Sequence, residues 1–180
     1  MPLAAIHYAS GSLIDDFVGT IVARLRAEGF RVGGVVQEND GKGACAAMTL
    51  VDIATATRFD ISQDLGALAA SCRLDPRGLA DAGYGLEQAI DETIDILVIN
   101  KFGKAEAEIG GGLRTTFVHA LALGIPVLTA VRPPYDQAWT QFHGGLAADL
   151  PVEVEGVLAW CRNSIAERRA AALPTTAAVP

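Results

Sequence analysis

Short apolar runs alternate along this chain with longer segments whose apolar residues recur at helical spacing. Each run is typical of a strand buried inside a sheet, where both faces are covered. The runs lie at residues 3–8, 31–36, 94–99 and 126–131. The run at 94–99 is the clearest of them, and we expect it to form the central strand.

Helices are predicted between these strands. An apolar stripe runs from Ile14 to Leu25 at helical spacing, and Gly29 is expected to end this helix. Asp75 is expected to cap a second helix with Pro76 as its first residue. Further helices are predicted around Phe117, Trp139 and Val157. A strand, a helix and a second strand in that order form a parallel unit with a right-handed crossover. The pattern therefore predicts an α/β protein, a three-layer sandwich around a mostly parallel sheet.

A β-hairpin is predicted as an insertion in this alternating pattern. Residues 47–53 and 58–61 have strand character, and the segment 54–57 between them is turn-like. The sequence contains no internal repeat and no sign of a second domain. We therefore predict a single domain over residues 1–170, followed by a flexible tail, rich in Ala and Pro, at 171–180.

Composition narrows the class of protein. The chain has 180 residues, of which 51% are hydrophobic and 19% are charged, and this balance excludes a disordered chain. No apolar run is long enough to span a membrane, and the start of the chain has no basic segment followed by an apolar one. We therefore expect a cytoplasmic protein. Its net charge of −7 argues against a nucleic-acid partner, which usually requires a basic face.

The cysteines and histidines suggest neither a disulfide framework nor a metal site. Cys45, Cys72 and Cys161 are widely separated, so we expect reduced thiols that are mostly packed in the interior. His7, His119 and His143 show no spacing typical of metal ligands. No metal site is predicted, and the sequence leaves any cofactor open.

Three loops are expected at the carboxyl ends of the strands, where parallel sheets bind ligands. They cover residues 9–15, 100–112 and 132–137. Ser10, Gly11 and Ser12 in the first loop occupy the place of a phosphate-binding loop. The Lys and hydroxyl that grip phosphate and magnesium in such a loop are missing here. We expect Asp15 to cap the helix; alternatively, its carboxylate faces the site and repels phosphate.

The second loop combines cations with glycines before a helix. Asn100, Lys101, Lys104 and Arg114 could neutralise an oxyanion that backbone amides also bind. Glu106, together with Glu108, could serve as a base or reach a metal. The alternative is a solvated loop with surface ion pairs, which contribute little.

A third candidate site combines Ser62, Gln63 and Arg73. Arg73 could hold an oxyanion through two parallel hydrogen bonds, and the hydroxyl and the amide could add neutral ones. Alternatively, these side chains only make local turn hydrogen bonds.

The layout resembles that of the small P-loop nucleoside-triphosphatases of bacteria and archaea. Residues 31–36 (Arg-Val-Gly-Gly-Val-Val) match their second strand, 100–106 lie where their Walker B loop would be, and 124–128 match the next strand. The resemblance implies a P-loop-NTPase-like fold. Ile14 and Asp15 replace the lysine and hydroxyl of the Walker A loop, so the resemblance does not extend to magnesium-dependent hydrolysis.

A closer resemblance, over nearly the whole chain, is to a bacterial domain-of-unknown-function family that resembles degenerate versions of those enzymes. Some members are encoded beside molybdate-transport genes. The matching stretches are 50–55, 61–66, 72–76, 100–108 and 124–131. The resemblance implies no particular activity, but the cations listed above predict a small-anion-binding protein that does not hydrolyse its ligand, and the neighbouring transport genes suggest a role in metal homeostasis. The anion would be a molybdate- or tungstate-type oxyanion or the phosphate of a nucleotide.

Two other functions remain open. One is a diverged nucleoside-triphosphatase or phosphotransferase, with Lys104 and Glu106 in its site. The other is a protein-interaction scaffold that has lost its nucleotide site. A small oxyanion or nucleotide is the expected partner; we expect neither nucleic acid nor a membrane, and a homo-oligomer is possible.

Overall fold

One seven-stranded sheet forms the centre of the computed structural model, in the strand order β4-β3-β2-β7-β8-β1-β9. The structure describes all residues except 11, 41–46, 64–72, 92, 109 and 173–180. The strands are β1 (Leu3–His7), β2 (Val32–Asp40), β3 (Ala47–Asp52), β4 (Arg58–Asp60), β7 (Ile96–Ile99), β8 (Val127–Val131) and β9 (Ala147–Leu150). A separate small pair joins β5 (Ser62–Gln63) and β6 (Arg73–Leu74). Strands β9, β1, β8, β7 and β2 pair in parallel, whereas β2, β3 and β4 pair antiparallel.

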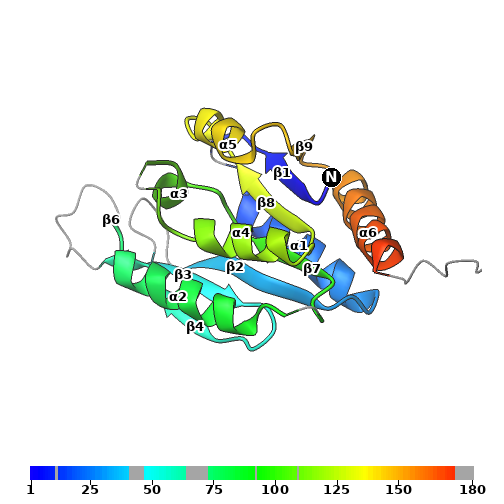
Figure 1. Cartoon of the computed structure of the whole chain (residues 1–180). Helices are drawn as coiled ribbons and strands as arrows, with labels where there is room; N and C mark the ends of the chain where they lie inside the picture. Colours follow the sequence, from blue (N-terminus) through cyan, green and yellow to red (C-terminus); the bar gives the residue numbers. More distant parts are fainter. Residues whose placement is uncertain (11, 41–46, 64–72, 92, 109, 173–180) are drawn as a thin grey trace, which may run out of the picture.

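Helices cover both faces of the sheet. They are α1 (Ile14–Ala27), α2 (Pro76–Ala89), α3 (Lys104–Glu108), α4 (Arg114–Ala122), α5 (Asp136–His143) and α6 (Val154–Ala171). One buried cluster packs α1 and α6 against the sheet, and a second packs α2, α4 and α5 against the other face. Figure 1 shows α2 and α4 in front of the strands and α6 at one side. Two apolar clusters separated by one sheet define three layers, which confirms the fold class. The antiparallel pairing of β3 with β4 confirms the predicted hairpin.

Several element ends follow from local chemistry. Asp75 caps α2 by accepting a hydrogen bond from the Arg77 amide, and Pro76 is the first helical residue. Gly29, with φ of +86°, adopts the left-handed conformation just past α1. Both predictions are confirmed.

The sequence pattern missed four of the described elements: β9, α3 and the two-residue strands β5 and β6. Among the described strands, β9 pairs with β1 alone and so forms an edge of the sheet. Its Ala-Ala-Asp-Leu sequence contains no buried residue, so it lacks an apolar run. The segment 100–112 is not wholly loop, because α3 forms inside it.

Strand β2 passes unusually close to β7 at Gly34. A Cβ atom on Gly34 would lie 1.9 Å from the Val98 carbonyl oxygen, and φ at this residue is +107°. Only glycine fits both the space and the backbone conformation. Gly34 therefore allows the close approach of β2, the strand that leads into the hairpin, to the central strand β7.

Asp95 ties three segments together at the amino end of β7. Its carboxylate accepts a hydrogen bond from the Arg31 amide at 2.8 Å and forms an ion pair with Arg169 of α6, also at 2.8 Å. Burial acts to raise the pKa of Asp95, but these hydrogen bonds and the Arg169 charge outweigh it, so the pKa lies below its ordinary value. We call Asp95, Arg31 and Arg169 the Asp95 clasp.

Other sequence expectations meet the structure only in part. Cys161 is buried with a free thiol, whereas Cys45 and Cys72 lie outside the described residues. Ala171 ends α6, and most of the expected tail, 173–180, also lies outside them. Among the described helices, none combines the length and apolarity that crossing a bilayer would require.

Candidate functional site

A cavity of about 780 Å³ opens at the edge of the sheet where the parallel strands end. It lies beyond the carboxyl ends of β1, β8 and β7 and beside β2. Residues of α3 and of the β3–β4 hairpin also line it. Polar or charged lining residues include Tyr8, Gln37, Asn100, Lys101, Lys104, Glu106, Arg132 and Tyr135. Such crevices beyond the carboxyl ends of strands are where open α/β sheets bind ligands. We call this space the strand-end cavity.

Asp15 and Lys101 form an ion pair beside this cavity. The ammonium nitrogen Nζ of Lys101 lies 2.7 Å from Oδ1 and 3.0 Å from Oδ2 of Asp15. The two side chains, Lys101 and Asp15, are 25% and 19% exposed, so solvent screens the pair only partly. Asn100 and Asn39 donate hydrogen bonds to the same carboxylate at 2.6 and 2.7 Å. The carboxylate of Asp15 is therefore held from three sides.

The expectation that Asp15 caps α1 is wrong. The N-cap residue is Leu13, whose side chain makes no capping hydrogen bond, and Asp15 is the second residue of the helix. Its side chain turns to the strand ends instead. A carboxylate there complements the positive end of the helix and repels an incoming anion.

The charges on the helix and the strand are reversed relative to a phosphate-binding loop. In such a loop the cation lies at the helix start, and acids follow the neighbouring strand. Here the acid Asp15 lies at the helix start and the cation Lys101 follows β7. An anion that enters the strand-end cavity would therefore meet positive charge from Lys101 after β7, and not from the start of α1.

Glu106 organises the loop between β7 and α4. Its buried carboxylate accepts hydrogen bonds from the Gly103 amide at 2.9 Å and the Leu113 amide at 3.0 Å. A Cβ atom on Gly112 would lie 2.2 Å from Oε1 of Glu106, so only glycine fits against this carboxylate. With both oxygens held by amides, Glu106 acts as a structural anchor and is poorly placed to take up a proton as a base.

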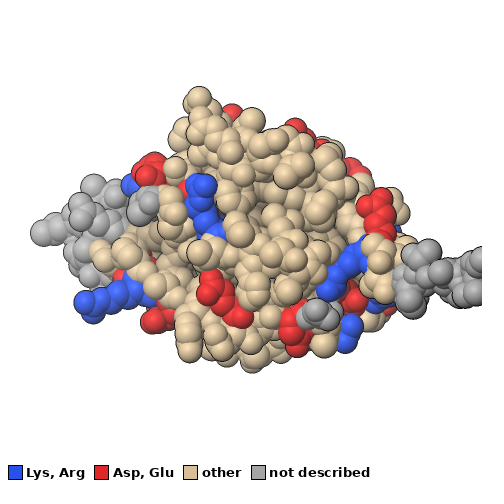
Figure 2. Space-filling view, viewed as in Figure 1, with Lys and Arg blue, Asp and Glu red and all other residues tan. Residues whose placement is uncertain are grey.

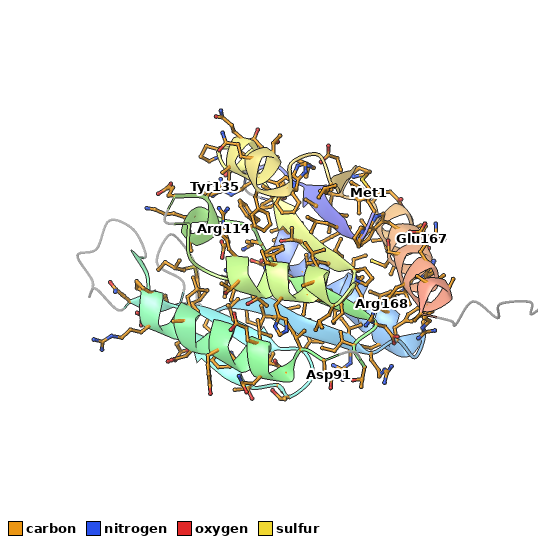
Figure 3. All side chains as sticks on the ribbon, in the orientation of Figure 1. Met1, Asp91, Arg114, Tyr135, Glu167 and Arg168 are labelled. Carbon is orange, nitrogen blue, oxygen red and sulfur yellow. The ribbon has the colours of Figure 1, made fainter. Side chains whose placement is uncertain are left out.

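Arg114 points to a different surface. Its guanidinium donates a hydrogen bond to the Glu106 carbonyl at 2.9 Å and lies 4.7 Å from the centre of the Phe142 ring. It lines a separate shallow groove with His119 and Phe142. Figure 3 labels Arg114. Among the described residues it is not one that lines the strand-end cavity.

Lys104 and Arg132 supply the other cations of the cavity. Lys104 is exposed, and its ammonium nitrogen lies 3.8 Å from the Glu108 carboxylate one helical turn away. Arg132 donates to the Pro133 carbonyl at 2.9 Å, and its guanidinium carbon lies 5.8 Å from the Tyr135 ring centre. Sequence analysis identified the 132–137 loop by its position but singled out no residue in it.

Tyr8 is a second residue that sequence analysis missed. It follows β1 at the strand-end cavity. Burial raises the pKa of its hydroxyl, and the nearby Arg132 charge opposes that rise. A neutral tyrosine beside a guanidinium can donate its proton in a hydrogen bond to a ligand.

The remaining predicted site residues lie elsewhere or have local partners. Ser10 and Ser12 are exposed, and the Ser12 hydroxyl donates to the Ala9 carbonyl at 2.8 Å. The Ser62 hydroxyl accepts from the Met48 amide at 3.0 Å. Gln63 pairs with Arg73 in the β5–β6 ladder. Gly11 and the side chain of Arg73 lie outside the described structure.

Charged side chains are scattered over the face of the molecule seen in Figure 2, and acidic and basic groups lie beside one another at several places on it. Within the described part of the chain, no three His, Cys, Asp or Glu side chains group closely enough to hold a metal ion.

The fold is that of the small P-loop nucleoside-triphosphatases. A solved human cancer-related nucleoside triphosphatase matches with a TM-score of 0.61 and 14% identity, over 94% of this chain and 98% of that one. THEP1 from the hyperthermophile Aquifex aeolicus matches with a TM-score of 0.60 and 11% identity, over 89% and 95% of the two chains. At these identities the likeness concerns the fold alone.

The chain belongs to the family described as Protein of unknown function (DUF2478), whose model matches residues 3–160. It is also 41% identical, over 164 residues, to the Molybdenum import ATP-binding protein ModC 2 of Bradyrhizobium diazoefficiens. That match covers 90% of this chain but 18% of the relative, so the chain spans about a fifth of the relative's length.

Proposed function

We propose that this protein binds a small anion in the strand-end cavity, either a molybdate-type oxyanion or the phosphate of a nucleotide, and does not hydrolyse it. One observation carries the proposal. Lys101, Lys104 and Arg132 line the same cavity in a chain whose net charge is −7. Cations gathered at one site of an acidic protein attract a small anion locally, although the whole surface repels polyanions.

The residues at the start of α1 support binding without hydrolysis. Hydrolysis of a nucleoside triphosphate by this fold uses a helix-start lysine for the phosphates and a hydroxyl for magnesium. The corresponding residues here are Ile14 and Asp15, and Asp15 is already bonded to Lys101. The loop is therefore a degenerate Walker A loop in this proposal.

The choice of anion rests on the relative from Bradyrhizobium. Its name assigns it to molybdenum import, and it contains a segment similar to nearly all of this chain. Molybdate and tungstate are tetrahedral dianions that amides, hydroxyls and cations bind as they bind phosphate. We accordingly place the protein in molybdate or related metal homeostasis, in the cytoplasm, with self-association still to be measured.

Calorimetry tests this proposal directly. The purified protein is titrated with molybdate, tungstate, sulfate, ATP and GTP at constant ionic strength, because electrostatic affinities depend on salt. We expect at least one of them to bind, and we expect Lys104→Met to weaken that binding about tenfold or more. Arg24→Met removes one positive charge from α1, where Arg24 pairs with Glu155, and serves as the matched control.

Two results would overturn the proposal. One is no binding by any of the five anions. The other is magnesium-dependent phosphate release from ATP or GTP that is lost in Lys104→Met, which would identify a diverged nucleoside-triphosphatase instead.

A further inference from the structure

The strand-end cavity is long. Its lining includes residues on or just after five neighbouring strands: Met48 on β3, Gln37 on β2, Asn100 after β7, Arg132 after β8 and Tyr8 after β1. Neighbouring strands lie about 4.8 Å apart, so four spacings separate its ends by roughly 19 Å. A compact ion can occupy only part of this length.

The two halves of the cavity differ in chemistry. The half beyond the carboxyl ends of β7, β8 and β1 contains the cations Lys101, Lys104 and Arg132. The half beside β3, β2 and α2 is mainly apolar: Gln37 is a polar residue there, and the apolar lining consists of Met48, Leu50, Ile61, Leu74 and Leu79. Met48 and Leu74 are half-buried, so their side chains offer apolar surface to a ligand.

Two tyrosines lie in the cationic half. Tyr8 follows β1, and Tyr135 lies beside the Arg132 guanidinium. Tyrosine offers both an apolar ring that can stack and a hydroxyl that can bond to an anion. Both features suit a ligand that is partly apolar.

The volume also disagrees with a bare oxyanion. An ion of four oxygens fills about as much space as four waters, on the order of 120 Å³ at about 30 Å³ per water. The cavity measures about 780 Å³, inside the range of about 300–1,000 Å³ that is typical of sites for organic ligands. If the ligand were a lone oxyanion, water would fill the apolar half of the cavity.

We propose that the ligand is an organic anion, a phosphate-like group joined to an apolar or aromatic body. This inference rests on the proposed function and specifies the class of ligand. The anionic group lies against Lys101, Lys104 and Arg132, and the body extends across β7 and β2 to Met48 and Leu74. Burial of that body supplies affinity that the anionic group alone lacks.

A ligand series that differs only in the organic body tests the inference. The full chain is titrated with inorganic phosphate, phenyl phosphate, 1-naphthyl phosphate and AMP under the same conditions. We expect at least one organic phosphate to bind about tenfold or more tightly than inorganic phosphate, because its ring is buried. Inorganic phosphate should compete with it, since both use the same cations.

Two variants locate the body of the ligand. Met48→Ala removes side-chain surface from the apolar half, and should weaken organic phosphates severalfold while leaving inorganic phosphate unchanged. Ala47→Ser alters the exposed neighbouring residue of β3, which does not line the cavity, and should change neither.

The possible outcomes separate this inference from the proposed function. Equal affinity for inorganic and organic phosphates, or equal weakening of both by Met48→Ala, would overturn the inference and leave anion binding intact. If neither these compounds nor the five anions tested above bind, the proposed function fails, and this inference fails with it.

Discussion

Lys101 and Asp15 lie 86 positions apart in the chain, yet the Lys101 ammonium is 2.7 Å from the Asp15 carboxylate. The contact joins the end of the central strand to the first turn of α1. Lys101 is therefore already neutralised by a carboxylate of its own chain. An external anion has to compete with Asp15 for this cation.

Replacing Asp15 by Asn should strengthen anion binding. Asp15→Asn removes the competing negative charge but keeps the size of the side chain and an acceptor oxygen for Asn100 or Asn39. We expect the affinity for the bound anion to rise about tenfold, the effect of removing one nearby like charge from a partly buried site. Titration calorimetry measures it.

Asp16 provides the matched control for this substitution. Asp16→Asn changes the same charge at the next residue of α1, where the side chain is exposed. We expect less than a twofold change in affinity from this variant. If Asp15→Asn also changes affinity less than twofold, Asp15 does not compete with the ligand.

Substitution at Glu106 should destabilise the protein. Glu106→Gln replaces one accepting oxygen with an NH₂ group that faces the amide of Gly103 or Leu113. The expected loss of unfolding free energy is about 1–3 kcal/mol, the cost of leaving a buried donor unpaired. Urea denaturation measures it. Glu108→Gln, in an exposed residue of the same short helix, should cost less than about 0.5 kcal/mol.

Two glycine-to-alanine substitutions should act in opposite directions. Gly34→Ala forces a Cβ atom to within 1.9 Å of the Val98 carbonyl oxygen and should cost more than about 3 kcal/mol of stability. Gly19 lies inside α1, and a Cβ atom added there would meet nothing within 4 Å, so Gly19→Ala should stabilise by about 0.5–1 kcal/mol. Urea midpoints of the two variants test both signs, and a neutral Gly34→Ala would contradict the close approach of β2 and β7.

The Asp95 clasp predicts a pH-dependent contribution to stability. The pKa of Asp95 is lower in the folded state than in the unfolded state, where it is about 3.9. The stabilisation that the ionised carboxylate provides is therefore complete above the unfolded-state pKa. It is lost as the pH falls through the folded-state pKa. At pH 7, Asp95→Asn should cost about 2 kcal/mol. That difference from the wild type should shrink below about pH 4.

Asp81→Asn, in an exposed residue of α2, is the control for this pH series. Its stability should follow that of the wild type at every pH. A deficit in Asp95→Asn that stays constant down to about pH 2.5 would show that the clasp does not depend on the charge of Asp95.

The sequence predicted the elements whose residues are buried on both sides. β7 and β8 are continuous apolar runs because helices cover both faces of the central sheet, and such runs are visible without any partner. The pattern did not predict β9, because this edge strand is held in the sheet by backbone hydrogen bonds to β1. Its side chains are exposed or half-buried, so no apolar pattern marks it.

For the candidate site, the sequence predicted which residues line the cavity better than it predicted which side chains bond to one another. Lys101 and Lys104 were identified because they follow a central strand, and both line the cavity. Arg132 follows β8 in the same way, but a single cation beside two prolines carries no pattern of its own. The bond between Asp15 and Lys101 depends on how α1, which follows β1, packs beside the end of β7, although β8 separates β1 from β7 in the sheet. Local sequence does not predict that arrangement.

The central strand β7 is fixed at both ends, with the Asp95 clasp before Ile96 and the Asn100 bond to Asp15 after Ile99. It therefore behaves as a short rigid rod between its anchors, held in the sheet by β2 and β8. A conformational change that encloses a ligand cannot come from sliding this strand. Of the described segments that line the cavity, α3 and the loop that follows β8 are therefore places to look for ligand-induced protection from hydrogen exchange.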